Sequence, residues 1–154
     1  MGLFGPSKGT SESAQELILE FLQSRELDAD QALVLDEPNY SIWSVARGSA
    51  PVCIHLDKDP EAPWISVVCP IVTMPEEGDF SALLRYCMEQ NAQMPAPLAL
   101  EENTISVRAG RPVEGLDKEE VDTLIEIVGW VADKHDNELA DKFGCKMIGE
   151  DSED

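Results

Sequence analysis

The segment YSIWSVARGSAPVCIHLD, residues 40–57, decides the fold class. It holds two stretches rich in β-branched and aromatic residues, 40–47 and 52–57, on either side of a short link that contains Gly48 and Pro51. Two such stretches joined by a short Gly- and Pro-containing link are typical of a β-hairpin. Because a hairpin pairs its strands in opposite directions, the segment predicts an antiparallel sheet.

Three more stretches extend this sheet. WISVVCPIV, residues 64–72, is almost continuously apolar and predicts a buried central strand. PLALEE (97–102) and NTISVRA (103–109) predict a second hairpin. Residues 32–36, ALVLD, fit either a short strand or a linker.

Apolar residues at helical spacing predict one helix before the first strand and another between the central strand and the second hairpin. The first spans about 12–27, where Ser13 followed by Glu16 fits a capping box. The second follows Asp79, whose carboxylate can cap a helix through FSALLRYCMEQNAQ, 80–93. The apolar stripe of this middle helix contains Phe80, Leu83, Leu84, Cys87 and Met88.

A third helix is predicted over about 118–143. Asp117 can cap it, with Glu120 three residues later, and Leu116 and Val121 flank the cap in the positions of a hydrophobic staple. Its apolar stripe contains Val121, Leu124, Ile125, Val128, Ala132, His135, Leu139 and Phe143.

The predicted order is α-β-β-β-α-β-β-α, which indicates an α+β fold with a mostly antiparallel sheet and helices packed on it. A length of 154 residues suits one domain. We expect a flexible leader over 1–10, a single domain over 11–145, and an acidic tail over 146–154.

Composition limits the partners. The net charge is −20, from 31 acidic and 11 basic residues, and such a field repels the phosphates of nucleic acids. No apolar stretch approaches the ~18 residues of a transmembrane helix, and no signal peptide is recognisable. The cysteines form no C-x-x-C pair, which favours a reduced, cytoplasmic protein. They are Cys53, Cys69, Cys87 and Cys145.

His55, Asp57 and Asp59 alternate along a predicted strand and the loop after it. Alternate residues share one face of a strand, so these three could hold a divalent cation. An EF-hand loop starting at Asp57 fails, however, because Ala62 stands where glycine is required and Val68 where glutamate is required. The alternative is an ordinary hairpin loop with Cys53, His55 and Asp57 on the outer face, and we favour it, with no metal and no cofactor.

Catalytic motifs are hard to find in this sequence. His135 lies on the apolar stripe of the last predicted helix, where a packed histidine is more common than a catalyst. No nucleotide-binding G-x-x-x-x-G-K-[ST] loop and no serine in a nucleophile-elbow context occur. The sequence therefore favours a protein that is not an enzyme, and a hydrolase that uses His135 is a weaker alternative.

Aromatic and apolar residues outside the stripes are candidates for contact with a partner. Trp43 and Trp64 lie in neighbouring predicted strands, and Trp130 lies just off the stripe of the last helix. Tryptophan is enriched at binding hot spots, but we expect at least two of these three in the core. Ala82, Tyr86 and Met94 lie in or just after the middle helix and predict a homodimer through that helix or the adjoining sheet.

The order of elements resembles that of type III secretion chaperones. The segments 42–57, 64–75 and 83–139 are similar to the YbjN-like family, and the resemblance covers about residues 12–144. Its most family-like features are Arg108, Arg111-Pro112, Glu114-Gly115-Leu116-Asp117 and Ala132-Asp133.

This resemblance implies a small acidic α+β domain of the secretion-chaperone fold, often dimeric, with no agreed enzymatic activity. In secretion chaperones, apolar patches on the sheet and the first helix hold a non-globular segment of a client protein, and the second helix and neighbouring strands usually build the dimer. We expect structural roles for Arg108 and Arg111, because both guanidinium groups can pair with carboxylates such as that of Glu114. We therefore expect a non-enzymatic, chaperone-like protein-interaction or regulatory domain, with a protein partner or client segment. The alternative is a regulator that binds a divalent metal or small ligand through the loop at His55, Asp57 and Asp59.

Overall fold

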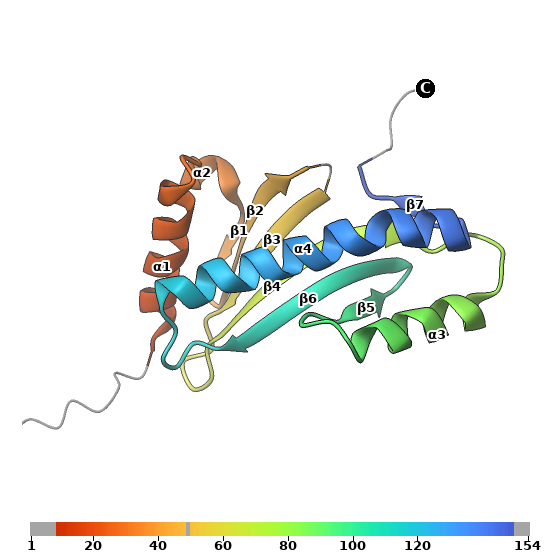
Figure 1. The fold of residues 1–154 in the computed structure, drawn as a ribbon. Coiled ribbons are helices and arrows are strands. Elements are labelled where there is room, and N and C mark those ends of the chain that lie inside the picture. The colour runs from red at the N-terminus through yellow and green to blue at the C-terminus, as the bar shows by residue number, and fades with distance from the viewer. Residues whose placement is uncertain (1–8, 49, 150–154) are drawn as a thin grey trace, which may run out of the picture. The chain divides into compact units, whose positions relative to one another are not determined.

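The computed structural model describes residues 9–48 and 50–149. Within these ranges the chain forms four helices and seven strands, shown in Figure 1. In chain order they are α1 (Ser11–Ser24), α2 (Ala29–Ala32), β1 (Leu33–Glu37), β2 (Tyr40–Arg47), β3 (Ala50–Asp57), β4 (Trp64–Thr73), α3 (Phe80–Asn91), β5 (Leu98–Glu101), β6 (Thr104–Pro112), α4 (Lys118–Phe143) and β7 (Lys146–Met147).

The described strands form one sheet in the order β1-β2-β3-β4-β6-β5, and β7 pairs with the end of β4. The pairs β1–β2, β4–β7 and β5–β6 are antiparallel. The predicted α+β class with a mostly antiparallel sheet is therefore confirmed. The stretch 32–36, which fitted either a strand or a linker, contributes most of β1.

Burial alternates along the strands of the first hairpin, as a sheet with one face on a core requires. In β3 the side chains of Val52, Ile54 and Leu56 are buried, while Cys53 and His55 on the other face are half-buried. The strand β4 carries more buried residues than either hairpin strand, which agrees with its position between β3 and β6.

The chain packs as two compact units, and β2, β3, β4, β6 and α4 each contribute residues to both. The first unit contains the described residues up to Ser44, together with Cys53–Val67 and Gly110–Ile125. In it α1 contacts α2, and α2 contacts β1. The apolar face of α1 is buried through Ala14, Ile18, Phe21 and Leu22.

The second unit contains Val45–Val52, Val68–Ala109 and the described residues from Glu126 onward. In it α3 lies beside β5 (Figure 1). The side chain of Arg47 on β2 crosses α4 at Gly129, where a Cβ atom would fall on the guanidinium group. The same guanidinium donates a hydrogen bond to the main-chain oxygen of Glu126 (3.4 Å) and lies 3.7 Å from the Asp133 carboxylate.

The first helix begins differently from the prediction. Its N-cap is Thr10, whose hydroxyl accepts a hydrogen bond from the Ser13 amide at 3.1 Å, while the Ser13 hydroxyl accepts one from the Thr10 amide at 2.9 Å. The proposed Ser13–Glu16 capping box is therefore wrong. Thr10 also belongs to the helix start rather than to a leader, and Gly9 lies against Val113. The rest of that predicted leader, residues 1–8, lies outside the described residues.

The C-terminal segment also departs from the prediction. Lys146 and Met147 form β7 on Thr73 and Val72, and the Ile148 amide donates to the Ile71 carbonyl at 2.9 Å. The expected acidic tail over 146–154 thus begins as a short strand, because β4 leaves a free edge there. Residues 150–154 lie outside the described residues, and a single domain over 11–145 remains a prediction.

The start of α4 is as predicted. The Asp117 carboxylate accepts a hydrogen bond from the Glu120 amide at 2.8 Å, and the Glu120 carboxylate accepts one from the Asp117 amide at 3.0 Å. The Arg111 guanidinium pairs with Glu120 and donates to the main-chain oxygen of Glu114 at 2.8 Å. This arginine therefore supports the cap through Glu120 and the Glu114 main chain rather than through the Glu114 carboxylate.

The stripe of α4 is buried as expected at Val121, Ile125, Val128, Ala132, His135 and Leu139. Leu124 and Phe143 are half-buried. No helix in the described part of the chain combines the length and apolar character needed to cross a membrane.

The capping box gives the first test. We expect Asp117→Ala to lower the free energy of unfolding by about 0.5–2 kcal/mol, because it removes the acceptor of the Glu120 amide. Glu119→Ala is the matched control, since Glu119 is exposed in the same turn and outside the box. Thermal or urea unfolding followed by circular dichroism measures both. Equal stability of the two variants would contradict a role for Asp117 in starting α4.

Candidate functional site

An apolar groove between α3 and β5 is the candidate site in the second unit. It has a volume of about 260 Å³. Met88 is 71% exposed and Leu100 is 46% exposed, although both are large and apolar. Its lining residues are Leu84, Cys87, Met88, Asn91, Leu98, Ala99, Leu100 and Ile105.

This groove exists because the predicted stripe of α3 is only partly buried. Leu83 and Cys87 face the core, whereas Phe80, Leu84 and Met88, spaced four residues apart, are exposed. Residues at this spacing form one row on a helix. The α3 row, which is Phe80, Leu84 and Met88, therefore offers apolar surface that the described chain does not cover.

The thiol of Cys87 forms part of the groove wall. Burial, together with the Cys145 thiol, raises the pKa of Cys87 to about 11. The thiol therefore stays protonated at neutral pH and behaves as a small apolar group rather than as a nucleophile.

A hydrogen-bonded chain of polar side chains joins α3 to α4 beside this groove. The Tyr86 hydroxyl donates to the Glu138 carboxylate and lies 3.3 Å from Nδ1 of His135. Since the hydroxyl proton goes to Glu138, its oxygen is left to accept from an Nδ1–H group of His135. That tautomer leaves Nε2 as an acceptor, and Nε2 is buried with no hydrogen-bond partner in the described chain.

The surroundings of these three hydrogen-bonded side chains set their protonation states. Burial lowers the pKa of His135, and the positive charge of Lys134 acts in the same direction, while Glu138 and Asp136 oppose it. The hydrogen bond from Tyr86 lowers the pKa of Glu138, and burial raises the pKa of Tyr86. The side chain of His135 has no exposed surface, so it cannot contact a substrate in this conformation. This burial counts against the hydrolase alternative.

Two of the predicted metal-ligand candidates, Asp57 and Asp59, form hydrogen bonds within the loop after β3. The Asp57 carboxylate accepts a hydrogen bond from the Asp59 amide (3.0 Å), and the Asp59 carboxylate accepts one from the Glu61 amide (2.9 Å). Nδ1 of His55 lies 2.8 Å from the Tyr40 hydroxyl. Over residues 9–48 and 50–149, no three His, Cys, Asp or Glu side chains are grouped so as to hold a metal ion.

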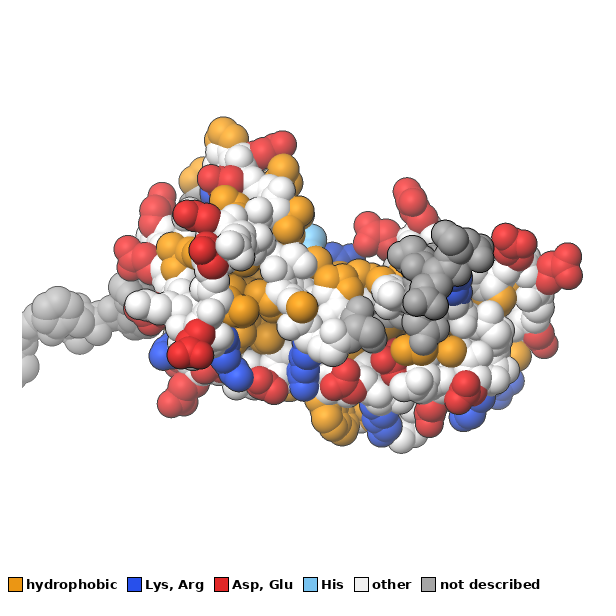
Figure 2. All heavy atoms as spheres, turned by 90° about the horizontal axis from the view of Figure 1, so that it is seen from above, with side chains coloured by type: hydrophobic (Ala, Val, Ile, Leu, Met, Phe, Trp, Pro, Cys, Tyr) orange, Lys and Arg blue, Asp and Glu red, His pale blue; other side chains and the backbone are white. Residues whose placement is uncertain are grey.

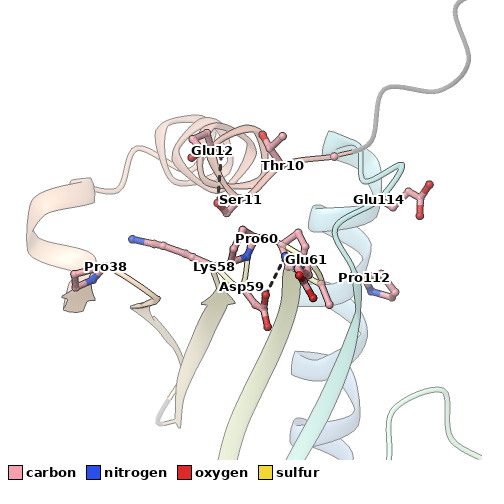
Figure 3. Close-up of a pocket in the computed structure, with 13 residues that line it drawn as sticks. Thr10, Ser11, Glu12, Pro38, Lys58, Asp59, Pro60, Glu61, Pro112 and Glu114 are labelled. Carbon is pink, nitrogen blue, oxygen red and sulfur yellow. Dashed lines mark hydrogen bonds between the residues drawn. The ribbon is translucent and has the colours of Figure 1, made fainter.

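An open cleft of about 1050 Å³ lies beside the same loop, in the first unit. Figure 3 shows that the start of α1 and the loop at 58–61 border it, with Pro112 nearby. Lys58 extends toward Pro38 and pairs with Asp36 at 3.0 Å. A small ligand in this cleft remains a prediction.

The tryptophans differ from expectation. Only Trp43 is in the core, with 2% of its surface exposed, whereas Trp64 is 44% and Trp130 is 52% exposed. The expectation that at least two are core residues is therefore wrong. Trp64 lies over Gly110, where a Cβ atom would approach its Nε1 to 2.6 Å, and the Lys134 ammonium lies 5.5 Å from the Trp130 ring centre. Trp43 is too buried to contact a partner.

The other predicted interface residues lie apart from the groove lining. Ala82 is exposed, and its amide donates to the Asp79 cap at 3.1 Å. Met94 is half-buried after the end of α3, and Tyr86 is engaged with Glu138. None of the three lines the groove.

Arg108 has a different partner from the one suggested by the sequence. It pairs with Glu101 at 3.3 Å rather than with Glu114, because both residues lie on the β5–β6 hairpin. This pair is consistent with a structural role for Arg108.

Sequence reasoning missed Leu100 and Asn91. The sequence predicts that Leu100 lies in a strand but does not predict that its side chain is exposed at a binding surface. The signal that could have identified the groove is the α3 row beyond the buried pair Leu83 and Cys87.

Comparison with known proteins identifies the fold. No family model and no curated protein matches the sequence. Among solved structures, the chain is similar to a chain of the HopA1–SchA chaperone–effector complex, with a TM-score of 0.57 and 13% sequence identity. The match covers 80% of this chain and 93% of the other. It supports the chaperone-like fold predicted from the order of elements.

The buried histidine predicts a pH dependence. An unfolded histidine titrates near its ordinary pKa of about 6.5, whereas burial keeps His135 neutral to lower pH in the folded chain. The unfolded state therefore binds more protons as pH falls below about 6.5, and the free energy of unfolding should decrease. We expect this loss between about pH 7.5 and 5.5 to be smaller in His135→Gln than in the unmodified protein. Urea unfolding at several pH values measures it, and parallel pH profiles would contradict the assignment.

Proposed function

We propose that this chain is a non-enzymatic, chaperone-like protein-interaction domain that holds a segment of a partner protein in the groove between α3 and β5. The single observation that carries this proposal is the exposed apolar lining of the groove, above all Met88 and Leu100. Soluble chains seldom leave such contiguous apolar surface uncovered unless it binds something. The likeness to a chain of a chaperone–effector complex is consistent with this role.

The surface charge supports a protein partner. Figure 2 shows acidic side chains over much of the face that it displays, with fewer basic ones. With a net charge of −20, nucleic acid is an unfavourable partner, whereas a segment with apolar and basic residues is favoured. We also propose a cytoplasmic location, on the free cysteines, and membership of the YbjN-like family, on the resembling residues within 12–144.

A homodimer is a further part of the proposal. Phe80 at the start of α3 is exposed outside the groove lining, and a two-fold contact there would cover it with its own copy while leaving Leu84 and Met88 to the partner segment. The alternative of a small-ligand regulator has one observation in its favour, the cleft beside the loop that contains Asp59.

The groove can be tested with matched charge substitutions. We expect Met88→Asp to weaken partner capture from native cytosol at least about tenfold, because losing the burial of a methionine costs ~1.5–3 kcal/mol and ~1.4 kcal/mol is a factor of ten. Val34→Asp is the control, since Val34 is also exposed and lies on β1 in the other unit. Capture is quantified by mass spectrometry after circular dichroism confirms folding. The same proteins captured in equal amounts by both variants would disprove the groove as the binding surface.

Light scattering tests the homodimer. We expect a dimer mass in about 0.15 M salt, where charges are screened beyond ~8 Å, and a larger monomer fraction at low salt, where the acidic chains repel each other. Phe80→Ser should shift the balance toward monomer, because it removes an apolar end of the α3 row. A monomer mass at every salt concentration would refute the dimer without affecting the groove.

A further inference from the structure

A fully buried histidine lies where α3 contacts α4 in the second unit. The side chain of His135 has no exposed surface, and its ring meets the Tyr86 ring of α3 edge-on, with 6.1 Å between the ring centres. The Tyr86 hydroxyl lies 3.3 Å from Nδ1 of His135 and donates to the Glu138 carboxylate. The Lys142 ammonium lies 5.0 Å from the centre of the Tyr86 ring. In this arrangement Nδ1 carries the hydrogen of a neutral imidazole and Nε2 carries none.

Protonation of this imidazole would add a hydrogen at Nε2. That atom is buried without a hydrogen-bond partner in the described part of the chain. The Glu138 carboxylate lies 4.0 Å from Nδ1, on the other side of the ring, and already accepts from Tyr86. The further charges that act on His135 are those of Lys134 and Asp136 on the same helix. A charged imidazole here would be a buried ion with an unpaired donor, which favours a conformation in which water reaches it.

The other titratable groups at this contact keep their charge in mildly acidic solution. Burial raises the pKa of Tyr86, so its hydroxyl stays protonated. Burial also raises the pKa of the neighbouring thiols, that of Cys87 to about 11 and that of Cys145 in the same direction. The hydrogen bond from Tyr86 lowers the pKa of Glu138, which therefore stays ionised. His135 is therefore the group at this contact that gains charge between about pH 7.5 and 5.5.

The helix α3 can move away from α4 without disturbing the sheet. Of its twelve residues, two are buried, Leu83 and Cys87. The segments on either side of it, 74–79 and 92–97, contain no helix or strand, so a shift of α3 breaks no strand. Elements with few buried apolar residues open at a lower free-energy cost than the rest of a domain.

We propose that protonation of His135 in mildly acidic solution opens the contact between α3 and α4, so that α3 separates from α4 while the sheet stays folded. In the closed form the imidazole is neutral, and Tyr86 contacts both it and Glu138. In the open form Nε2 carries the added proton and donates to water. Histidines that gain charge just below neutral pH are a common basis for such switches.

The proton balance gives the direction and size of the effect. Burial lowers the pKa of His135 in the closed form, whereas a hydrated histidine titrates near about 6.5. The open form therefore binds more protons as the pH falls, and its population increases. A single proton of this kind raises the opening equilibrium by about tenfold between about pH 7.5 and 5.5.

Amide hydrogen exchange of the full chain, followed by NMR, tests the opening. The rates at each pH are divided by those of an unstructured chain, which leaves the opening equilibrium. We expect amides 86–90 of α3 to be protected at least about tenfold less than those of the central strand β4. Their protection should fall by about tenfold between about pH 7.5 and 5.5.

Two substitutions identify the group responsible. His135→Gln should remove the fall in α3 protection, because glutamine does not titrate. His55→Gln is the matched control, since His55 is the other histidine of the chain and lies on β3. It should behave like the unmodified protein. A fall that persists in His135→Gln would assign the effect to another group and overturn the proposal, as would equal protection of the α3 and β4 amides.

The imidazole itself gives a readout that needs no variant and decides the matter if His135→Gln does not fold. Nitrogen-15 NMR of the histidine rings should show hydrogen on Nδ1 and none on Nε2 of His135 at pH 7.5. The midpoint of its titration should lie below about 6.5. A midpoint at or above that value would mean that the closed contact accepts the charge, and it would overturn the switch.

Opening of α3 has a consequence that rests on the proposed function, because α3 forms one wall of the groove. Partner captured at pH 7.5 should elute at pH 5.5 from the unmodified protein and from His55→Gln, and stay on His135→Gln. Retention on all three, with α3 protection still falling, would support the opening and overturn the groove as the binding surface. Retention on all three with unchanged α3 protection would overturn the switch and leave the proposed function intact.

Discussion

Burial of the apolar stripe on α4 is the constraint on which the rest of the structure depends. The helix contributes Val121 and Ile125 to one compact unit, and Val128 and Leu139 to the other. Neither unit would keep its buried residues if the helix were displaced, because large apolar side chains lost from a core cost several kcal/mol. The capping box at its start and the ion pair between Arg111 and Glu120 hold the first turn in place.

The sequence predicted the elements whose signals are local. The cap at Asp117 and Glu120 lies within one turn, and the alternation from 52 to 57 is visible without any partner strand. It did not predict β7, because a two-residue strand has no periodicity and depends on the free edge of β4. Nor did it predict that Trp64 lies over Gly110 of β6 with 44% of its surface exposed.

The candidate site was harder to predict because its contacts join residues far apart in the chain. Tyr86 meets Glu138 and His135 across two helices, and the stripe pattern could not distinguish the buried Leu83 from the exposed Leu84. The fold itself does not assign a function, since one architecture serves many roles. The functional argument therefore depends on what the groove exposes, namely the apolar side chains of Met88 and Leu100.

The contact between Arg47 and Gly129 ties two distant positions together. A helix interior normally favours alanine over glycine by ~1 kcal/mol, so a glycine buried in α4 costs stability by itself. Here the missing side chain is the space that the arginine occupies, and a Cβ atom would also approach Cδ of Arg47 to 2.8 Å. A side chain at 129 would therefore displace the guanidinium, and with it the hydrogen bond to Glu126 and the pair with Asp133, a move that the flexible Arg47 side chain can make. The glycine thus keeps this arginine against α4 rather than in solvent.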